Sequence, residues 1–367
     1  MKKTLHKPVF YQTGYRNGVK GVLTKAFCKF LKAGEQDVIY DTQMPKRLKF
    51  PPPGTALGSR GMSHYGIMIS DLPAPHHFMA NMILIGYSGW KAWDDDSLLQ
   101  SNAKNTISIG HGTAITTHDP LLVIDRMRSN LREDGSLLHF SDEYELRCEY
   151  PKFYLKSHVG SFKTDLELTS TDVISWAGSS EMYRHFSLMC TYQGLIEFEG
   201  QLTSVNGLCT FEYGTGYLPY MDLKRPLPKA FKLPANFFTY HVINLSATQQ
   251  LLFCVVGAYE DQSASVVAEL RDVNEGAKRF GKRVTFDVLE FRDSKEINPR
   301  SGEQMSLPQK FCWTIEGTSD GTIYIDCQVD SSWLYAAMGY IAGYTWTSNM
   351  PDHTEGRGYF EYSDRRD

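Results

Sequence analysis

Short segments in which hydrophobic and polar residues alternate dominate the chain from residue 77 onward. The segment 143–150 (EYELRCEY) alternates strictly, with Tyr144, Leu146 and Cys148 on one face and charged residues on the other. A period of two is typical of a β-strand that buries one face. Similar segments, separated by Gly, Ser and Asn turns, recur at 77–90, 105–116, 163–171, 182–192, 194–200 and 207–214. This spacing predicts a β-sandwich or a meandering antiparallel barrel.

A proline-rich segment divides these predicted strands into two sets. Residues 214–234 contain prolines at 219, 226, 228 and 234, and proline lacks the N–H that a sheet requires. Strand-like segments resume at 236–245 and continue to 356–363. A chain of 367 residues also exceeds the usual size of one domain. We therefore predict an N-terminal helix and irregular arm at 1–60, a first β-barrel domain at 61–214, a linker at 215–235 and a second β-barrel domain at 236–367.

The segment 18–33 has the period of an amphipathic helix. Leu23, Phe27, Phe30 and Leu31 share one face, and four lysines occupy the rest of the surface. Two interpretations remain open. The helix packs its apolar stripe over the end of a barrel, or it rests on an anionic membrane surface and makes the protein membrane-peripheral.

The two sets of strands end in the same way. An offset of 149 residues aligns Met189 with Met338, Gly194 with Gly343 and Gly207 with Gly356, and it superimposes Phe-Glu-Tyr at 211–213 on Phe-Glu-Tyr at 360–362. In each copy a strand ends at a glycine, a loop of equal length follows, and a strand that begins with glycine closes the set. This correspondence predicts an internal duplication.

The closing strands resemble those of the two-domain calycin (lipocalin-like) proteins, the group of the carotenoid 1,2-hydratases and AttH-type proteins. Gly356-Arg357-Gly358-Tyr359-Phe360-Glu361 matches their Gly-x-Gly-aromatic-x-Glu pattern, whereas 207–212 keeps one glycine and has Thr210 at the aromatic position. The resemblance covers about residues 60 to 367. It implies an all-β fold of two lipocalin-like antiparallel barrels and cofactor-independent action on large apolar isoprenoid or polyketide molecules. No catalytic residue carries over through a matched motif.

Composition and motifs exclude several other classes of function. The net charge of −4 does not favour a nucleic-acid partner. The seven cysteines are scattered without a CxxC pair or a Cys/His cluster, so we predict no metal site and a reducing, cytoplasmic location. No glycine-rich nucleotide-binding loop is present, which predicts no cofactor. His64 lies in a Gly-Met-Ser-His-Tyr-Gly segment that lacks the strand–turn–helix context of a serine hydrolase.

Two histidines share the apolar face of predicted strands. His111 alternates with Ile107 and Ile109, and His241 alternates with Phe237 and Ile243. An imidazole in an apolar cavity has its pKa lowered and can exchange a proton near neutrality. We name His111 and His241 as candidate catalytic residues; the alternative is a core histidine that is hydrogen-bonded to backbone.

Three aspartates follow two tryptophans in the segment 90–96 (WKAWDDD). A carboxylic acid beside aromatic walls can stay protonated and donate a proton to an alkene, while the aromatic faces stabilise the resulting cation. Asp94, Asp95 and Asp96 are therefore candidate acids; the alternative is an acidic surface turn. We predict that the pocket is lined by Trp90, Trp93, Trp176 and Tyr192.

These features favour a cofactor-independent isomerase, cyclase or hydratase that acts by proton transfer on a large apolar isoprenoid, steroid-like or lipid substrate. The alternative is a lipid-binding or carrier protein of the same fold without catalysis. The sequence leaves the oligomeric state open.

Overall fold

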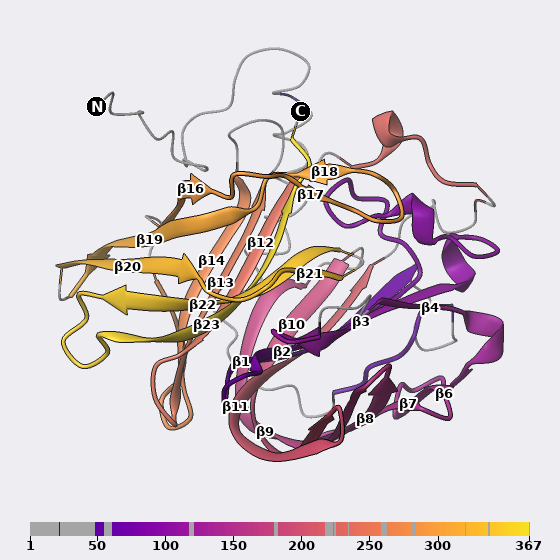
Figure 1. The fold of residues 1–367 in the computed structure, drawn as a ribbon, viewed down its shortest axis with the longest axis horizontal. Coiled ribbons are helices and arrows are strands. Elements are labelled where there is room, and N and C mark those ends of the chain that lie inside the picture. The colour runs from indigo at the N-terminus through magenta and orange to yellow at the C-terminus, as the bar shows by residue number, and fades with distance from the viewer. Residues whose placement is uncertain are drawn as a thin grey trace.

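The fold is all-β in the part of the chain that the computed structural model describes (Figure 1). The described residues are 22, 48–54, 61–116, 121–179, 183–216, 223, 225–233, 235–257, 263–280, 284–319, 321–336 and 338–366. Apart from Val22, the predicted helix at 18–33 lies outside them. No helix in the described part of the chain is long and apolar enough to cross a membrane.

The first sheet contains eleven antiparallel strands in the order β4-β3-β2-β1-β11-β10-β9-β8-β7-β6-β5. Its strands are β1 (Met62–Leu72), β2 (His77–Ile85), β3 (Thr106–Thr113), β4 (Leu121–Asp125), β5 (Asn130–Leu131), β6 (Leu137–Ser141), β7 (Tyr144–Glu149), β8 (Lys152–Val159), β9 (Phe162–Ser179), β10 (Tyr183–Phe198) and β11 (Gln201–Gly216). The edge strands β4 and β5 are joined by the short 3-10 helix η3 (Arg126–Arg128) alone. The four residues between these strands let their ends lie at most about 18 Å apart, so the sheet must curl until its two edges approach.

The second sheet repeats this plan in the order β15-β14-β13-β12-β23-β22-β20-β19-β16. Its strands are β12 (Phe237–Asn244), β13 (Gln249–Gly257), β14 (Ser263–Asp272), β15 (Gly276–Arg279), β16 (Val284–Phe291), β19 (Pro308–Thr318), β20 (Gly321–Val329), β22 (Gly339–Ser348) and β23 (Glu355–Asp364), while β21 (Leu334–Ala336) pairs with β22. The small pair β17 (Glu296–Ile297) and β18 (Gln304–Met305) lies apart. In both sheets the first strand pairs with the last, and the edges are successive strands of the chain.

Each curled sheet fills its interior with apolar side chains. Phe153 stacks on Phe211 in the first core with ring centroids 4.0 Å apart, and Phe253 stacks on Trp313 in the second at 4.4 Å. Burial of such surface stabilises the fold by about 25 cal/mol per Å². The apolar side chains of each described interior therefore form a hydrophobic core.

The two sheets pack against each other through outward faces. β1 contacts β12 and β23, and β2 contacts β22, as the adjoining ribbons in Figure 1 show. We call this region the inter-barrel seam; its buried apolar members include Met68, Phe78, Trp93, Phe238 and Tyr359. Gly343 allows the close approach, because a Cβ there would lie 2.7 Å from the Phe78 ring.

Candidate functional site

His111 lies in the first core, on β3. Its Nδ1 is 3.2 Å from the carbonyl oxygen of Ala80, and its Nε2 is 2.6 Å from the hydroxyl of Ser157. Burial lowers the pKa of His111 to about 3, so the ring is neutral near pH 7. With both ring nitrogens bonded, the contacts favour the core interpretation that the sequence left open.

His241 occupies a similar place in the second core, on β12. It stacks on Phe360 at 5.0 Å, and its nitrogens contact the hydroxyls of Thr239 at 2.8 Å and Tyr344 at 3.3 Å. Burial lowers the pKa of His241 well below its usual value. His111 and His241 belong to separate cores, so the structure does not bring these two candidates together.

Asp94, Asp95 and Asp96 join the first barrel to later segments. Asp94 accepts hydrogen bonds from the backbone and hydroxyl of Ser88, and Lys232 lies 3.4 Å from Asp94 and 2.6 Å from Asp96. Asp95 accepts from Asn298 at 2.9 Å. A polar pocket of about 220 Å³ beside them is lined mostly by charged side chains. The arrangement explains why Asp94 and Asp95 are buried, so these two lie neither beside a described apolar cavity nor on a solvated turn, whereas the side chain of Asp96 is 36% exposed.

Trp90 and Trp93 are buried and stack on each other with centroids 4.5 Å apart. Tyr183 continues the stack, 5.7 Å from Trp90 and 6.4 Å from Trp93. We call these three rings the aromatic platform. The hydroxyl of Tyr183 lies 3.1 Å from Nδ1 of His185, so the platform ends at a titratable group.

The other two predicted lining residues lie elsewhere in the first barrel. Trp176 on β9 is half-buried and packs on Phe186 with centroids 5.2 Å apart. Tyr192 on β10 is buried opposite Gly207 and borders a separate groove of about 450 Å³ with mostly polar walls. The structure therefore does not place Trp176 or Tyr192 on the aromatic platform.

His185, beside the platform, belongs to a buried cluster of polar side chains on the outer face of the first barrel. The register of the paired strands brings these side chains together. His64, Gly214 and His185 form one row across β1, β11 and β10, and Gly66, Glu212 and Ser187 form the next same-face row. Residues opposite each other in such rows are close enough to interact. The two glycines leave room for the imidazoles: a Cβ on Gly66 would lie 3.3 Å from Nε2 of His64.

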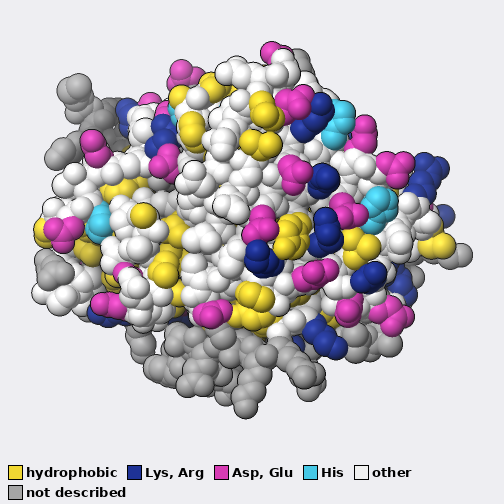
Figure 2. Space-filling model, turned by 90° about the horizontal axis from the view of Figure 1, so that it is seen from below, with side chains coloured by type: hydrophobic (Ala, Val, Ile, Leu, Met, Phe, Trp, Pro, Cys, Tyr) yellow, Lys and Arg dark blue, Asp and Glu magenta, His cyan; other side chains and the backbone are white. Residues whose placement is uncertain are grey.

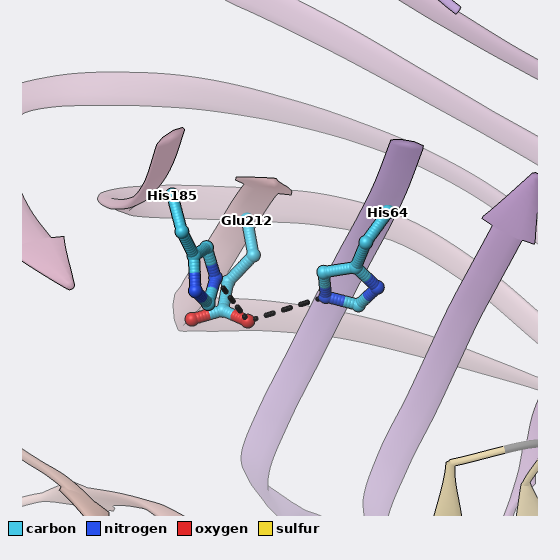
Figure 3. Close-up of side chains that lie close together, drawn as sticks. All are labelled: His64, His185 and Glu212. Atoms are coloured by element: carbon cyan, nitrogen blue, oxygen red, sulfur yellow. Dashed lines mark hydrogen bonds and ion pairs between the residues drawn. The ribbon is translucent and has the colours of Figure 1, made fainter. Parts of the chain in front are cut away.

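Both histidines point to one oxygen of Glu212 (Figure 3). The Nε2 atoms of His64 and His185 lie 3.4 and 3.3 Å from Glu212 Oε2, and Ser187 donates a hydrogen bond to Oε1. The Ser187 hydroxyl is also 3.0 Å from that of Tyr240, which belongs to the second barrel. The cluster therefore faces the inter-barrel seam.

The electrostatics of this cluster fit an ionised carboxylate. Burial opposes ionisation of Glu212, but His185 and His64 together hold its pKa well below the usual range. Burial lowers the pKa of His64, which keeps that imidazole available as a proton acceptor. The three ligand atoms also lie within 4.8 Å of one another, close enough to hold a divalent cation. Protein donors already occupy both oxygens of Glu212, so the carboxylate is satisfied without an ion.

His185 and Glu212 were not predicted as site residues from the sequence, and His64 was considered only as part of the Gly-Met-Ser-His-Tyr-Gly segment. A signal was present: Glu212 alternates with Phe211 and Tyr213, which point into the core, so Glu212 must point outward. Its position in the repeated Phe-Glu-Tyr segment would have drawn attention to it.

A larger groove on the first sheet has both polar and apolar walls. It has a volume of about 570 Å³ and is lined by two exposed leucines and by charged groups that pair with each other, as Lys163 does with Glu197 at 2.7 Å and His158 with Glu143 at 3.2 Å. Figure 2 shows acidic and basic side chains interspersed on one face of the molecule, without a large area of one sign.

Several solved structures share the fold. A putative AttH from Nitrosomonas europaea has a TM-score of 0.57 and 14% identity over 88% of this chain and 98% of its own. Kievitone hydratase from Nectria haematococca has a TM-score of 0.56 and 11% identity over 90% and 99%, and CghA with Sch210972 has 0.50 and 9% over 89% and 96%. No curated protein matches the sequence significantly.

These likenesses confirm the predicted resemblance to the AttH-type calycins and the all-β fold of lipocalin-like barrels. Identities this low show the fold alone. Residues 82–367 match the family described as "Family of unknown function (DUF6670)", and the chain belongs to this family.

Proposed function

We propose that the protein is a cofactor-independent isomerase, cyclase or hydratase that transfers protons to and from a large apolar isoprenoid, steroid-like or lipid molecule. The observation that carries the proposal is the buried carboxylate of Glu212, shared by His64 and His185 and placed beside the aromatic platform. The second barrel covers this cluster, which therefore lies where two domains meet, a common place for small-molecule sites.

The chemistry follows from the charges and the surfaces. An ionised carboxylate orients the imidazoles and stabilises the imidazolium that forms when one of them takes a proton. The stacked faces of Trp90, Trp93 and Tyr183 bind apolar surface and stabilise a developing cation. Side chains alone supply each step, so the reaction needs no bound cofactor.

The names of the similar structures agree with this class of reaction. One is a hydratase, and another was solved with a small molecule bound. A hydratase adds water across a double bond, which requires one proton to reach carbon and another to leave the water.

Deuterium transfer tests the proposal across many possible substrates at once. The protein is incubated in D₂O with a panel of isoprenoid and polyene alkenes and with an apolar extract of the expressing cells, and the products are analysed by mass spectrometry. We expect at least one compound to gain carbon-bound deuterium with the wild type and none to do so with Glu212→Gln. The matched control Glu145→Gln changes a half-buried glutamate of β7 outside the cluster and should retain the transfer.

The alternative is a lipid carrier of the same fold. It predicts that an apolar compound co-purifies with the protein but never gains deuterium. That result, together with unchanged ligand in the Glu212→Gln variant, would refute the enzymatic proposal and support the carrier.

Several further properties belong to the same proposal. We propose that the chain arose by internal duplication, with domains at 61–214 and 236–367 and a linker at 215–235; the matching strand orders of the two sheets support this. We propose a cytoplasmic protein with an apolar small molecule as its partner and no nucleic acid, in agreement with the net charge of −4.

A further inference from the structure

The two glutamates of the repeated Phe-Glu-Tyr segment occupy equivalent places. Glu212 lies on β11 opposite Gly66 of β1, and Glu361 lies on β23 opposite Tyr240 of β12. In each copy the flanking Phe and Tyr point into a barrel core, so the glutamate points outward. Because the outward faces meet at the inter-barrel seam, both side chains are buried, with 2% and 5% of their surface exposed.

The surroundings of the two carboxyl groups differ. Glu212 has two histidines and a serine, whereas among the described residues the carboxyl of Glu361 receives a side-chain hydrogen bond from Tyr359 alone, at 3.0 Å. No Lys, Arg or His among the described residues forms an ion pair with Glu361. A counterpart of His64 is absent because Phe238 occupies, opposite Ser363, the row position that His64 occupies opposite Gly214.

A carboxyl group in such a place keeps its proton. The groups that face Glu361 from neighbouring elements are Glu212 of β11, Tyr240 of β12 and Tyr359 of its own strand. None of them offers a compensating positive charge, and the ionised Glu212 repels a second negative charge. Burial and Glu212 accordingly raise the pKa of Glu361 well above its usual value, while the pKa of Glu212 is lowered. When the pKa of one of two nearby carboxyl groups is raised and the pKa of the other is lowered, the first is suited to act as a general acid and the second as a general base.

We propose that Glu361 is the proton donor of the inter-barrel seam and that the His64–Glu212–His185 cluster is the matching acceptor. This inference rests on the proposed function and deepens it, since it specifies a substrate with an electron-rich carbon–carbon double bond.

The proposed step balances in protons and electrons. The O–H bond of Glu361 breaks, and the electron pair of the double bond forms a C–H bond with that proton. The cation left on the other carbon then takes the oxygen of a water, or loses a proton from a neighbouring carbon. In either case the released proton passes to the cluster. Transfer of a proton from the cluster to Glu361 restores the starting state.

Infrared spectroscopy tests the protonation state directly. At neutral pH the wild type should show the carbonyl band of a buried protonated carboxylic acid, and Glu361→Gln should lack it. Glu355→Gln, which changes an exposed residue of the same strand, should retain the band. A spectrum unchanged by Glu361→Gln would overturn the proposal.

A stability measurement gives a second test. The unfolded chain ionises Glu361 above its ordinary pKa, whereas the folded chain keeps the proton, so stability falls as pH rises towards the folded pKa. Glutamine imitates the neutral acid, so Glu361→Gln should fold and lose this dependence. Between about pH 5 and pH 7 the unfolding equilibrium constant of the wild type should rise about tenfold more per pH unit than that of the variant. Parallel curves would overturn the proposal.

Measurement of deuterium transfer distinguishes failure of the donor role of Glu361 from failure of the proposed function. If wild type transfers deuterium and Glu361→Gln does not, the donor role is supported. If both transfer it equally, the donor role is overturned and the proposed function stands. If the wild type transfers none, the proposed function fails and the donor role with it, whatever the infrared spectrum shows.

Discussion

Replacement of His111 by asparagine should remove a defined part of the acid sensitivity of the protein. The folded state holds the neutral ring, with a pKa of about 3, whereas the unfolded chain takes up a proton near the ordinary pKa of 6.5. A group with a lowered folded pKa of this kind destabilises the fold as pH falls below 6.5. At about 1.36 kcal/mol per pKa unit, His111 costs about 2 kcal/mol of stability between pH 7 and pH 5, and about 3 kcal/mol between pH 7 and pH 4.

Urea unfolding at several pH values measures this cost. Asparagine keeps a donor where Nδ1 of His111 reaches the carbonyl of Ala80, and Ser157 keeps its contact with Thr164 at 2.8 Å, so the variant should fold. Its unfolding free energy should fall with acidification by about 2 kcal/mol less than that of the wild type between pH 7 and pH 5. The control His158→Asn removes a histidine outside the core and keeps the buried ring of His111, so a change confined to His111→Asn is assigned to that ring. If the unfolding free energy of His111→Asn instead falls with acidification as much as that of the wild type, His111 is protonated in the folded protein and is again a candidate acid.

Three other substitutions test the Lys232–Asp94 ion pair, the site and the seam. Lys232→Met leaves the buried Asp94 without its cation and should cost about 3–5 kcal/mol in chemical denaturation, whereas the exposed Lys229→Met should cost under about 1 kcal/mol. Tyr183→Phe removes the hydroxyl near His185 and should lower deuterium transfer about tenfold while stability changes by less than about 1.5 kcal/mol; an unchanged rate would exclude a positioning role. Gly110→Ala places a Cβ 2.7 Å from that of Ala336 and should lower the melting temperature through about 1–3 kcal/mol of overpacking, which calorimetry would detect.

Local alternation was enough to predict the strands but not their pairing. The segment 143–150 contains β7 (Tyr144–Glu149), and its apolar face is buried as expected. Pairing of β1 with β11, by contrast, brings Tyr65 opposite Tyr213, although all the other strands of the first sheet lie between β1 and β11 in the sequence. Period two fixes which face of a strand is apolar, but it carries no information about a partner so far along the chain.

The same limit explains why the cluster was missed. Glu212 and His185 alternate with core residues, so the pattern assigns them to the outward face, and polar residues on such a face are ordinarily solvated. Only the second barrel makes that face buried. Trp90 and Trp93 were predicted to line a pocket, and the structure shows them buried and stacked on each other, whereas the surroundings of Asp94 depend on Lys232, which is far away in sequence.

The packing of the barrels determines where a ligand can bind. Stacked rings such as Phe153 on Phe211 and Phe253 on Trp313 lie in the described interiors, so a ligand that took their place would displace core aromatics at a cost of several kcal/mol each. The seam has a different composition, because it combines the aromatic platform with the buried titratable groups His64, Glu212 and Glu361. Two equivalent carboxyl groups meet there, and histidines accompany only Glu212. Two carboxylates cannot both stay ionised in an interface that excludes water. Because histidines accompany only Glu212, this residue keeps its negative charge and acts as the base, and Glu361 keeps its proton and acts as the acid.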